Sequence, residues 1–447
     1  MSKHSESTVK GLLLLYNHPL AADAATIMEN VHAFERHSRF KVWTVNTQLG
    51  LPQSLGKLRF QGIVFHYSIF GDRYALNDQF LSYLEENRES YKVAFFQDEY
   101  HYCRQRFDFL NHHRIDCVYT LLEPTHFKDV YQKFTNVPKL ISHIPGYVSD
   151  DLIGIARRKA RPDEERAIDI GYRARPLPFY MGQGAQEKTG IATRFCERAR
   201  ALGLRLDIAT EEQSRIYGEA WYDFIANCRA FLGVEAGVSI FDVDDVVRHE
   251  ATRLLAERPG ITFQEMSERL LNSRENRIYY RTISPRHFEA AAFSVCQILF
   301  EGRYSGIIQP LVHYIPLKKD FSNFDDCIRM FQDKALRREL TDNAYRDLIG
   351  SGQYSYQKFI AEFDQTLLEA GLQREVQAEE AAQITARLKR DRLSLQLRAR
   401  KNALLYHTAF PGRRPLSVLG GPVLRLLRRL RETTSTRNPT LHSKERN

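Results

Sequence analysis

The chain has 447 residues, of which 43% are hydrophobic; this length exceeds one ordinary domain and predicts two core domains with an extension. No run of about 18 apolar residues occurs, and the first apolar stretch is short, so neither a transmembrane helix nor a signal peptide is predicted. The six cysteines are scattered without a CxxC spacing, which favours free thiols in a reducing cytoplasm over a zinc site.

The net charge of +9 is concentrated near the end of the chain. Residues 371–447 contain 17 Lys and Arg against 6 Asp and Glu, whereas residues 1–370 contain 47 against 49. The body is therefore nearly neutral and lacks the basic excess that is typical of nucleic-acid-binding domains. We expect no nucleic-acid partner.

Apolar runs rich in β-branched residues alternate with helix-like stretches over the first 150 residues, which predicts a parallel, doubly wound sheet. Ligands bind at the carboxyl ends of the strands of such sheets, where His66 and Asp98 are expected. The predicted strands are 11–16, 40–45, 62–67, 92–96, 116–121 and 139–144, and the predicted helices are 20–36, 74–88, 101–112 and 124–133.

The segment 143–152 contains Pro145 and Gly146 and is interpreted as a hinge, and 157–166 as a charged loop. A second alternation follows, and we expect domains at 1–150 and 151–370, with an insertion over 236–283 that has two helical pieces. The predicted strands are 167–173, 204–209, 229–235 and 295–300, and the predicted helices are 186–201, 212–227, 285–293, 323–333, 335–348 and 355–370.

Three segments resemble those of a known enzyme family: DIGYRARPLPFYMGQGAQEK (169–188), FLGVEAGVSIFD (231–242) and SPRHFEAAAFSVCQILFEGRYSG (284–306), continued by HYIPLKKDFSNFDD (313–326). With the two predicted doubly wound domains and a last helix that could cross back, they resemble the GT-B glycosyltransferases, more narrowly the bacterial group 1 (GT4-like) enzymes. The resemblance covers roughly residues 10–370. It implies two Rossmann-like domains facing across a cleft, followed here by a basic helical extension.

The most specific of these segments begins with a predicted helix start. Ser284 suits an N-cap and Pro285 the first helical position, and the free backbone N–H groups there can hold phosphate, with Arg286 and Arg281 adding charge. Glu289 follows one turn later, where a carboxylate can accept both hydroxyls of a ribose. The resemblance assigns Glu289 that role, as the last acid of an E-x7-E motif; the alternative is an ordinary surface glutamate.

The first acid of that motif is absent, because position 281 is arginine. Glu235, at the end of a predicted strand, is the candidate to replace it beside the donor hexose, and the alternative is a solvent-facing glutamate. The resemblance also implies a diphosphate clasp formed by an arginine after the strand at 167–173, either Arg173 or Arg175, together with Lys188. Cations there would stabilise a phosphate leaving group.

Acceptor chemistry is expected from the first domain. Asp98 could act as a base or orient the acceptor sugar, and His66 is a parallel candidate, although a lone strand-end histidine is more often a structural hydrogen-bonder. No metal-binding or Gly-Lys-Ser/Thr phosphate motif occurs, so neither a metal nor another cofactor is expected.

These features predict a cytoplasmic glycosyltransferase of the hexosyltransferase type. It would move a sugar from a nucleoside-diphosphate donor to a glycan, lipid-linked or protein acceptor, with retention of configuration. Two alternatives stay open: a nucleotide-sugar epimerase, and a GT-B-like module that binds nucleotide or glycan without turnover.

The basic extension predicts one further partner, an anionic membrane surface. Residues 374–405 are predicted to form a long exposed or self-associating helix, and the segment as a whole a partly disordered tail. In 422–432 an apolar face opposes a basic one, which is typical of a helix lying on an anionic membrane surface. The apolar face comprises Val423, Leu426, Leu427 and Leu430, and the basic face Arg425, Arg428 and Arg429. The alternative is a solvated or disordered end.

Overall fold

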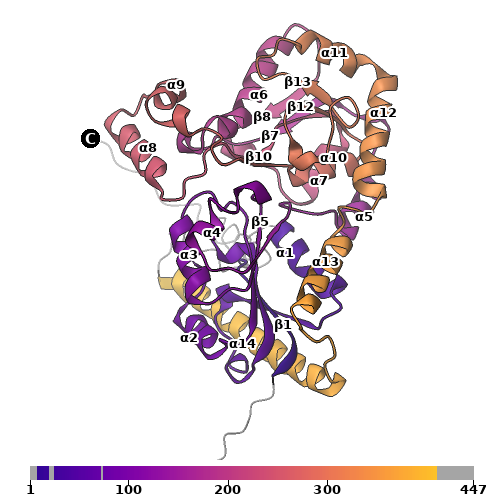
Figure 1. Ribbon diagram of the computed structural model, residues 1–447. Helices are drawn as coiled ribbons and strands as arrows, with labels where there is room; N and C mark the ends of the chain where they lie inside the picture. Colours follow the sequence, from indigo (N-terminus) through magenta and orange to yellow (C-terminus); the bar gives the residue numbers. More distant parts are fainter. Residues whose placement is uncertain (1–7, 20–24, 72–73, 410–447) are drawn as a thin grey trace, which may run out of the picture.

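The computed structural model describes residues 8–19, 25–71 and 74–409 of the chain. Two parallel sheets stacked along the long axis of the molecule form its two halves (Figure 1). Each sheet has helices on both faces. The predicted α/β class with two doubly wound sheets is confirmed.

The first sheet has six parallel strands in the order β2-β1-β3-β4-β5-β6. Except for the edge strand β6, its strands are largely buried because alternate side chains enter different cores: Leu13 and Leu15 pack with α2 and α3, whereas Leu12 and Leu14 pack with α1. The elements are β1 (Val9–Tyr16), α1 (Ala25–His37), β2 (Val42–Asn46), β3 (Phe60–Phe65), α2 (Asp78–Glu86), β4 (Tyr91–Phe95), α3 (Cys103–His112), β5 (Cys117–Thr120), α4 (Tyr131–Phe134) and β6 (Lys139–Ser142).

The second sheet has five parallel strands in the order β13-β12-β9-β7-β8. Leu232 and Leu299 again enter opposite cores, one beneath α6, α11 and α12 and the other beneath α5, α7 and α10. The elements are α5 (Asp150–Lys159), β7 (Ile168–Arg173), α6 (Gln183–Ala199), β8 (Leu206–Ala209), α7 (Glu219–Ala226), β9 (Cys228–Gly233), α10 (Pro285–Ala292), β12 (Cys296–Phe300), β13 (Ile315–Leu317), α11 (Phe324–Gln332) and α12 (Lys334–Ala344).

The predicted insertion leaves the second sheet after β9 and returns before α10. Its base is an antiparallel pair, β10 (Ala236–Val238) with β11 (Tyr280–Thr282), and its outer part carries α8 (Val246–Glu257) and α9 (Phe263–Met266). Figure 1 shows α8 and α9 standing to one side of both sheets. Tyr280 is nevertheless buried in the core of the first sheet, so the insertion joins the two halves.

The last two described helices return to the first sheet. α13 (Tyr356–Glu369) packs on α1, and its buried Asp364 accepts hydrogen bonds from Ser38 Oγ (2.7 Å) and the Arg39 N–H (2.6 Å). This contact confirms the expected helix that crosses back.

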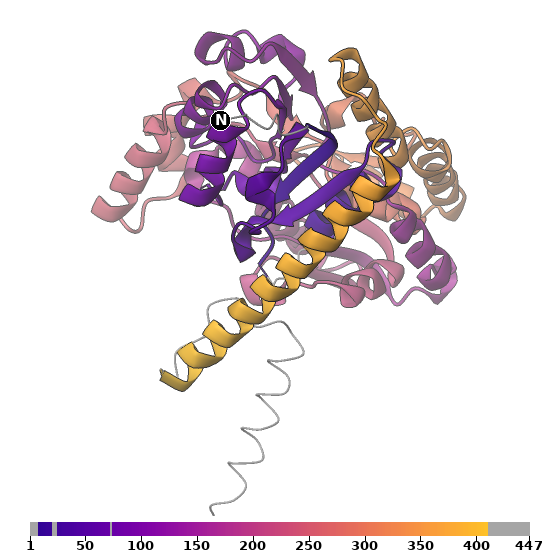
Figure 2. The same cartoon turned by 90° about the horizontal axis from the view of Figure 1, so that it is seen from below.

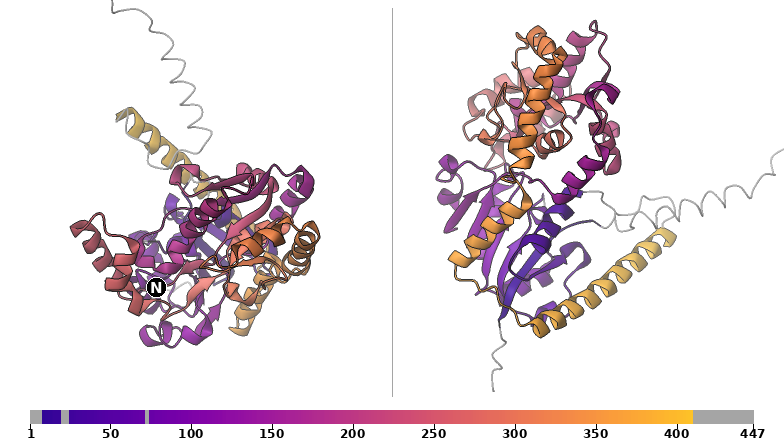
Figure 3. Two further views of the ribbon diagram at one scale, coloured as in Figure 1. Left: turned by 90° about the horizontal axis from the view of Figure 1, so that it is seen from above. Right: turned by 90° about the vertical axis from the view of Figure 1, so that its right-hand side faces the viewer.

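α14 (Ala378–Ala409) runs along the other face of the first sheet, and its far half projects beyond the body (Figures 2 and 3). Ile384 and Leu388 are buried against the sheet, and Trp43 Nε1 donates to Thr385 Oγ1 (3.0 Å). The helix predicted over 374–405 is therefore present, but its first half is packed rather than exposed. The segment 422–432 lies outside the described residues.

The segment between the two sheets differs from its prediction. The last residues of the predicted hinge (150–152) and the first of the predicted charged loop (157–159) belong to one helix, α5. Ser149 caps this helix by accepting from the Leu152 N–H (3.0 Å). Asp150 and Asp151 lie in its first turn and basic residues in its last, an arrangement that complements the helix dipole. Pro145 and Gly146 remain in the connection that precedes it.

Candidate active site

A pocket of about 470 Å³ lies between the carboxyl ends of β3 and β4 and the loop that follows β7. The first half contributes Asp98 and aromatic side chains such as Tyr67 and Tyr100. The second half contributes Arg175 and Tyr180. The pocket therefore belongs to both domains, at the sheet edges where ligands of doubly wound folds bind.

Asp98 follows β4 and has the left-handed backbone conformation (φ 56°), which is uncommon outside glycine and often found at functional sites. Its side chain is exposed within the pocket. Crowding by protein atoms nevertheless desolvates the carboxylate and raises its pKa, while the charges of Lys188, Arg106 and Arg175 oppose that rise. Asp98 thus faces cations from both domains.

Lys188 lies in the second turn of α6 and is half-buried. Desolvation lowers its pKa to about 8; Asp98 opposes this shift, and Arg281, Arg286 and Arg175 add to it. Several positive charges therefore repel one another at the cleft, an arrangement that a bound phosphate would relieve.

The structure separates the two candidate arginines after β7. Arg173 points away from the cleft, because it binds Asp207 Oδ1 (2.7 Å) and stacks over Phe224 (4.2 Å). Arg175 is exposed and lines the pocket. The geometry thus favours Arg175 as the partner of Lys188.

Helix α10 begins as its sequence predicts. Ser284 Oγ accepts from the Arg286 N–H (3.4 Å), and Pro285 occupies the first turn. The Arg286 side chain is exposed, stacks over Trp221 (5.1 Å) and donates to the carbonyl oxygen of Arg173. This helix start therefore lies beside the turn that follows β7, and both elements bring cations to the cleft.

Glu289 faces the first domain from α10. Burial raises its pKa, opposed by a hydrogen bond from Trp221 Nε1 (2.8 Å) and by the charge of Arg286. Across the cleft Glu29, on α1, has its pKa raised to about 7 by burial and by the charges of Glu289 and Asp151. Both acids line a small space of about 30 Å³.

Glu235 lies just past the end of β9, as expected, but both carboxylate oxygens are already engaged. They accept from Tyr279 Oη (2.9 and 3.0 Å) and from the N–H groups of Arg303 (3.1 Å) and Tyr304 (2.9 Å). Arg281 Nε lies 3.5 Å away. Glu235 is 2% exposed, and in this conformation it is a buried member of a hydrogen-bonded network.

Arg281 was expected to add positive charge beside a phosphate, but in the structure it is paired with two carboxylates. Its guanidinium group lies between Glu235 and Glu187 and forms an ion pair with Glu187. Lys319 Nζ also binds Glu187, from the solvent side (2.8 Å). Sequence reasoning missed this network because its members lie on four separate segments that only the fold brings together.

His66 is 1% exposed and lies at the end of β3, as predicted. Its Nδ1 accepts from the Ser68 N–H (3.1 Å), and burial lowers its pKa to about 3, so the ring is neutral. Among the described residues, Nε2 has no hydrogen-bond partner. The structure does not bring His66 to the pocket wall, unlike its neighbour Tyr67.

Sequence reasoning also missed Tyr67, Tyr100 and Tyr180 as pocket walls and Trp221 as the partner of Glu289. Tyr67 and Tyr100 have a signal in the sequence, since Tyr67 ends one predicted strand and Tyr100 closely follows another. Trp221 has none, because its contact with Glu289 spans 68 residues.

No family model and no curated protein matches this sequence. Among solved structures, an alpha-glucosyltransferase in complex with UDP-glucose and DNA containing an abasic site is similar over 81% of this chain and 100% of its own, with a TM-score of 0.52 and 10% identity. A second structure of an alpha-glucosyltransferase, in complex with UDP and a 13-mer DNA, has a TM-score of 0.50. Anabaena HepE, in complex with UDP and glucose, has a TM-score of 0.44, 10% identity and coverage of 80% and 99%. The likenesses with TM-scores of 0.52 and 0.50 show the fold, and the chain has the GT-B fold with two Rossmann-like domains.

Proposed function

We propose that this protein is a glycosyltransferase that moves a sugar from a nucleoside-diphosphate donor to an acceptor. The observation that carries the proposal is that Lys188 and Arg175 face Asp98, with Arg286 near Lys188, at the junction of two sheets in a GT-B fold. Cations suit the diphosphate of the donor, and a carboxylate suits an acceptor hydroxyl. The solved structures with similar folds include proteins described with UDP-glucose or UDP, which supports this donor class.

Each group has a defined role in this proposal. Lys188, Arg175 and Arg286, with the backbone N–H groups at the start of α10, hold the diphosphate and stabilise the charge that grows on it as the glycosidic bond breaks. Glu289 holds the ribose hydroxyls. Asp98 orients the acceptor hydroxyl in the pocket of about 470 Å³. Transfer proceeds with retention of configuration, and neither a metal nor another cofactor takes part.

Glu235 and His66 have indirect roles in this scheme. The hydrogen bonds to Glu235 fix the loop after β12 beside the donor, and a bound hexose would have to displace one of them to reach the carboxylate. His66 caps the turn that carries Tyr67 and Ser68 into the pocket. The space of about 30 Å³ beside Glu289 is too small for a nucleoside, so donor entry requires the cleft to open.

The acceptor is a glycan, lipid-linked or protein molecule, and the reaction occurs in the cytoplasm. A lipid-linked acceptor would fit a basic tail that rests on an anionic membrane. Among the residues that the structure describes, no helix is both long and apolar enough to cross a bilayer.

The engaged carboxylate of Glu235 favours one rival, a GT-B-like module that binds nucleotide or glycan without turnover. The test is incubation with a panel of nucleotide sugars, with and without a mixture of glycan acceptors, while thermal shift and nucleoside-diphosphate release are measured. Stabilisation with acceptor-dependent release supports the transferase, and stabilisation without release supports the module. Interconversion of donor sugars without release supports an epimerase. No stabilisation by any donor contradicts the transferase and the epimerase and leaves only a module that binds glycan.

A further inference from the structure

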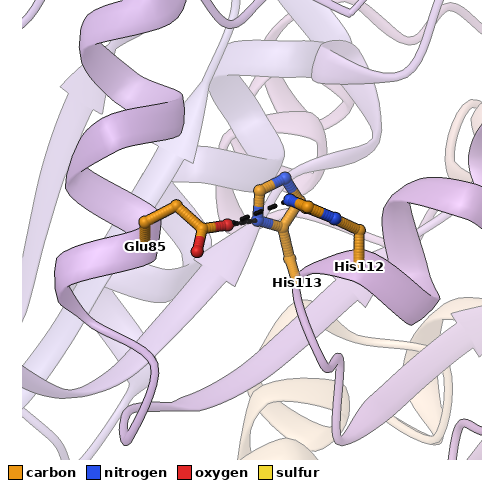
Figure 4. Close-up of side chains that lie close together, drawn as sticks. All are labelled: Glu85, His112 and His113. Atoms are coloured by element: carbon orange, nitrogen blue, oxygen red, sulfur yellow. Dashed lines mark ion pairs between the residues drawn. The ribbon is translucent and has the colours of Figure 1, made fainter.

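The ends of α2 and α3 bring three metal-ligating side chains together, far from the cleft. Glu85 Oε1 lies 3.0 Å from His112 Nε2 and 3.6 Å from His113 Nδ1. Figure 4 shows the carboxylate facing both rings. In the part of the chain that the structure describes, this is one group whose three ligand atoms all lie within 4.8 Å of one another.

We propose that Glu85, His112 and His113 form a structural site for Zn²⁺ or a related divalent transition metal. Two imidazole nitrogens and one carboxylate oxygen are ligands that Zn²⁺ prefers, and ligand atoms this close need only small shifts to surround one ion. His112 is 66% exposed, which leaves room for the ion to approach and for water to complete a tetrahedron.

Two of the three ligands are held in place by their surroundings. The His113 side chain is only 6% exposed, and its ring packs on Phe109 with centroids 4.5 Å apart. Glu85 is oriented by Arg88, whose Nε donates to the other carboxylate oxygen, Oε2 (2.8 Å). An arginine on the far oxygen leaves Oε1 for the metal and fixes the carboxylate, as outer partners of metal ligands commonly do.

Arg88 and the nearby Lys92 also set a limit on affinity, because their positive charges repel a cation. Arg88 is 54% exposed and screened by solvent, whereas Lys92 is buried and directs its ammonium group to the carbonyl oxygens of Arg88 (2.8 Å) and Ser90 (3.1 Å). We therefore expect weaker binding than at a closed structural zinc site.

The position of the cluster indicates a clip rather than a catalytic centre. Glu85 precedes β4 and His113 precedes β5, so the cluster lies at the amino edge of the sheet, opposite the cleft. A metal there would tie the end of α2 to the end of α3. This inference does not depend on the proposed transferase activity.

The test is calorimetric titration of Zn²⁺ into the untagged, chelator-stripped full chain, with thermal unfolding followed in parallel. We expect one Zn²⁺ per chain at this site and a higher Tm in zinc than in chelator. His112→Ala and Glu85→Gln should each weaken binding by at least about tenfold and abolish the Tm gain, which is the scale of losing a metal contact.

Two controls make the outcome decisive. His37→Ala removes a histidine that contacts a single carboxylate, Asp150 (3.7 Å), and should bind Zn²⁺ like the parent. His112 is exposed, so its variant should keep the Tm of the parent in chelator. Absence of binding to the parent chain, or equal binding by the parent and both site variants, would overturn the proposal.

Discussion

At the scale of single residues, the cleft contains two kinds of charge cluster. The one around Glu235 is closed: Arg281 joins Glu235 to Glu187, and few polar atoms remain for a ligand. The one around Lys188 has an excess of positive charge that Asp98 only partly offsets. A buried cation without a matching anion is costly unless a ligand supplies the missing charge, so the Lys188 cluster is the better phosphate site.

Lys188→Ala and Arg175→Ala should each lower turnover by about 10²- to 10³-fold, the scale of removing one preorganised group that stabilises transition-state charge. Their Tm values should stay near that of the parent. Arg173→Ala should instead lower the Tm and leave turnover near that of the parent, because Arg173 is bonded to Asp207 and stacked on Phe224. Steady-state kinetics and thermal unfolding of the three variants check this. Parent-like turnover in both of the first two would place the diphosphate elsewhere.

The same lysine predicts a pH dependence. Its pKa of about 8 in the free protein means that raising the pH through that value removes the positive charge that holds the donor. We expect kcat/KM for the donor to fall as pH rises through about 8, since this ratio reports groups of the free enzyme. Lys188→Arg should move that fall to higher pH. A parent profile that stays flat from pH 7 to about 9.5 would contradict the assignment.

Glu289→Ala should weaken nucleotide-sugar binding by roughly 1–3 kcal/mol, because it removes hydrogen bonds to a charged group. Calorimetry measures the effect, and Glu197→Ala, an exposed acid on α6, is the matched control. Glu289→Gln keeps an acceptor for Trp221 Nε1 and separates that contact from ribose binding. Unaltered donor affinity in the alanine variant would exclude the ribose role.

At the scale of elements, the insertion acts on the loop that carries Asp98. The Asp242 N–H donates to the Tyr100 carbonyl oxygen (2.9 Å), and the Tyr102 N–H donates to Asp245 Oδ1 (3.0 Å). Asp244 binds Arg104 (2.6 Å), although that pair is exposed and contributes little. The insertion thus fixes the first-domain side of the pocket while belonging to the second domain.

Asp245→Ala should raise the acceptor KM about tenfold and leave donor affinity unchanged. The variant loses a charge-assisted bond of about 1.5–3 kcal/mol that holds the loop after β4, and 1.4 kcal/mol corresponds to a factor of ten. Glu257→Ala, which removes an exposed pair on the same helix, serves as control. Equal loss of donor and acceptor affinity would indicate a general structural defect instead.

At the scale of the whole molecule, two C-terminal helices attach to the first domain. α13 ties the second domain to α1 through Asp364, and α14 is anchored by Asp391 Oδ2, which accepts from the Ser54 N–H (2.7 Å). Beyond that anchor, Leu393 and Leu397 are exposed (51% and 65%), and the far half of α14 projects from the body (Figure 3).

The full chain should sediment with anionic liposomes at low salt and much less at high salt, because each basic residue near such a surface contributes about 1 kcal/mol that salt screens. A chain ending at residue 410 should sediment less under both conditions. Neutral liposomes provide the control for apolar adsorption. Equal sedimentation of the two chains, or none for either, would exclude the proposed membrane contact through 422–432.

The sequence alone determined most of the secondary structure and the fold class. Buried strands appear as continuous apolar runs, and Ser284 with Pro285 marks the start of α10, because these signals are local along the chain. The same local reasoning placed His66, Asp98 and Glu235 at strand ends and Glu289 one turn into a helix. It failed at α5. Pro145, Gly146 and the charged residues led to a predicted hinge and loop, although Ser149 and the charges of the following residues are typical of a helix start and a helix dipole.

Only the tertiary structure decided which of these residues share a site. Side-chain direction separated Arg175 from Arg173, because it depends on Asp207 and Phe224, which lie on other elements. Packing turned Glu235 toward Arg281 and buried His66, while it brought Lys188 and Asp98 from two domains to one cleft. Contacts between distant segments depend on how the sheets dock, which no periodicity within one segment encodes.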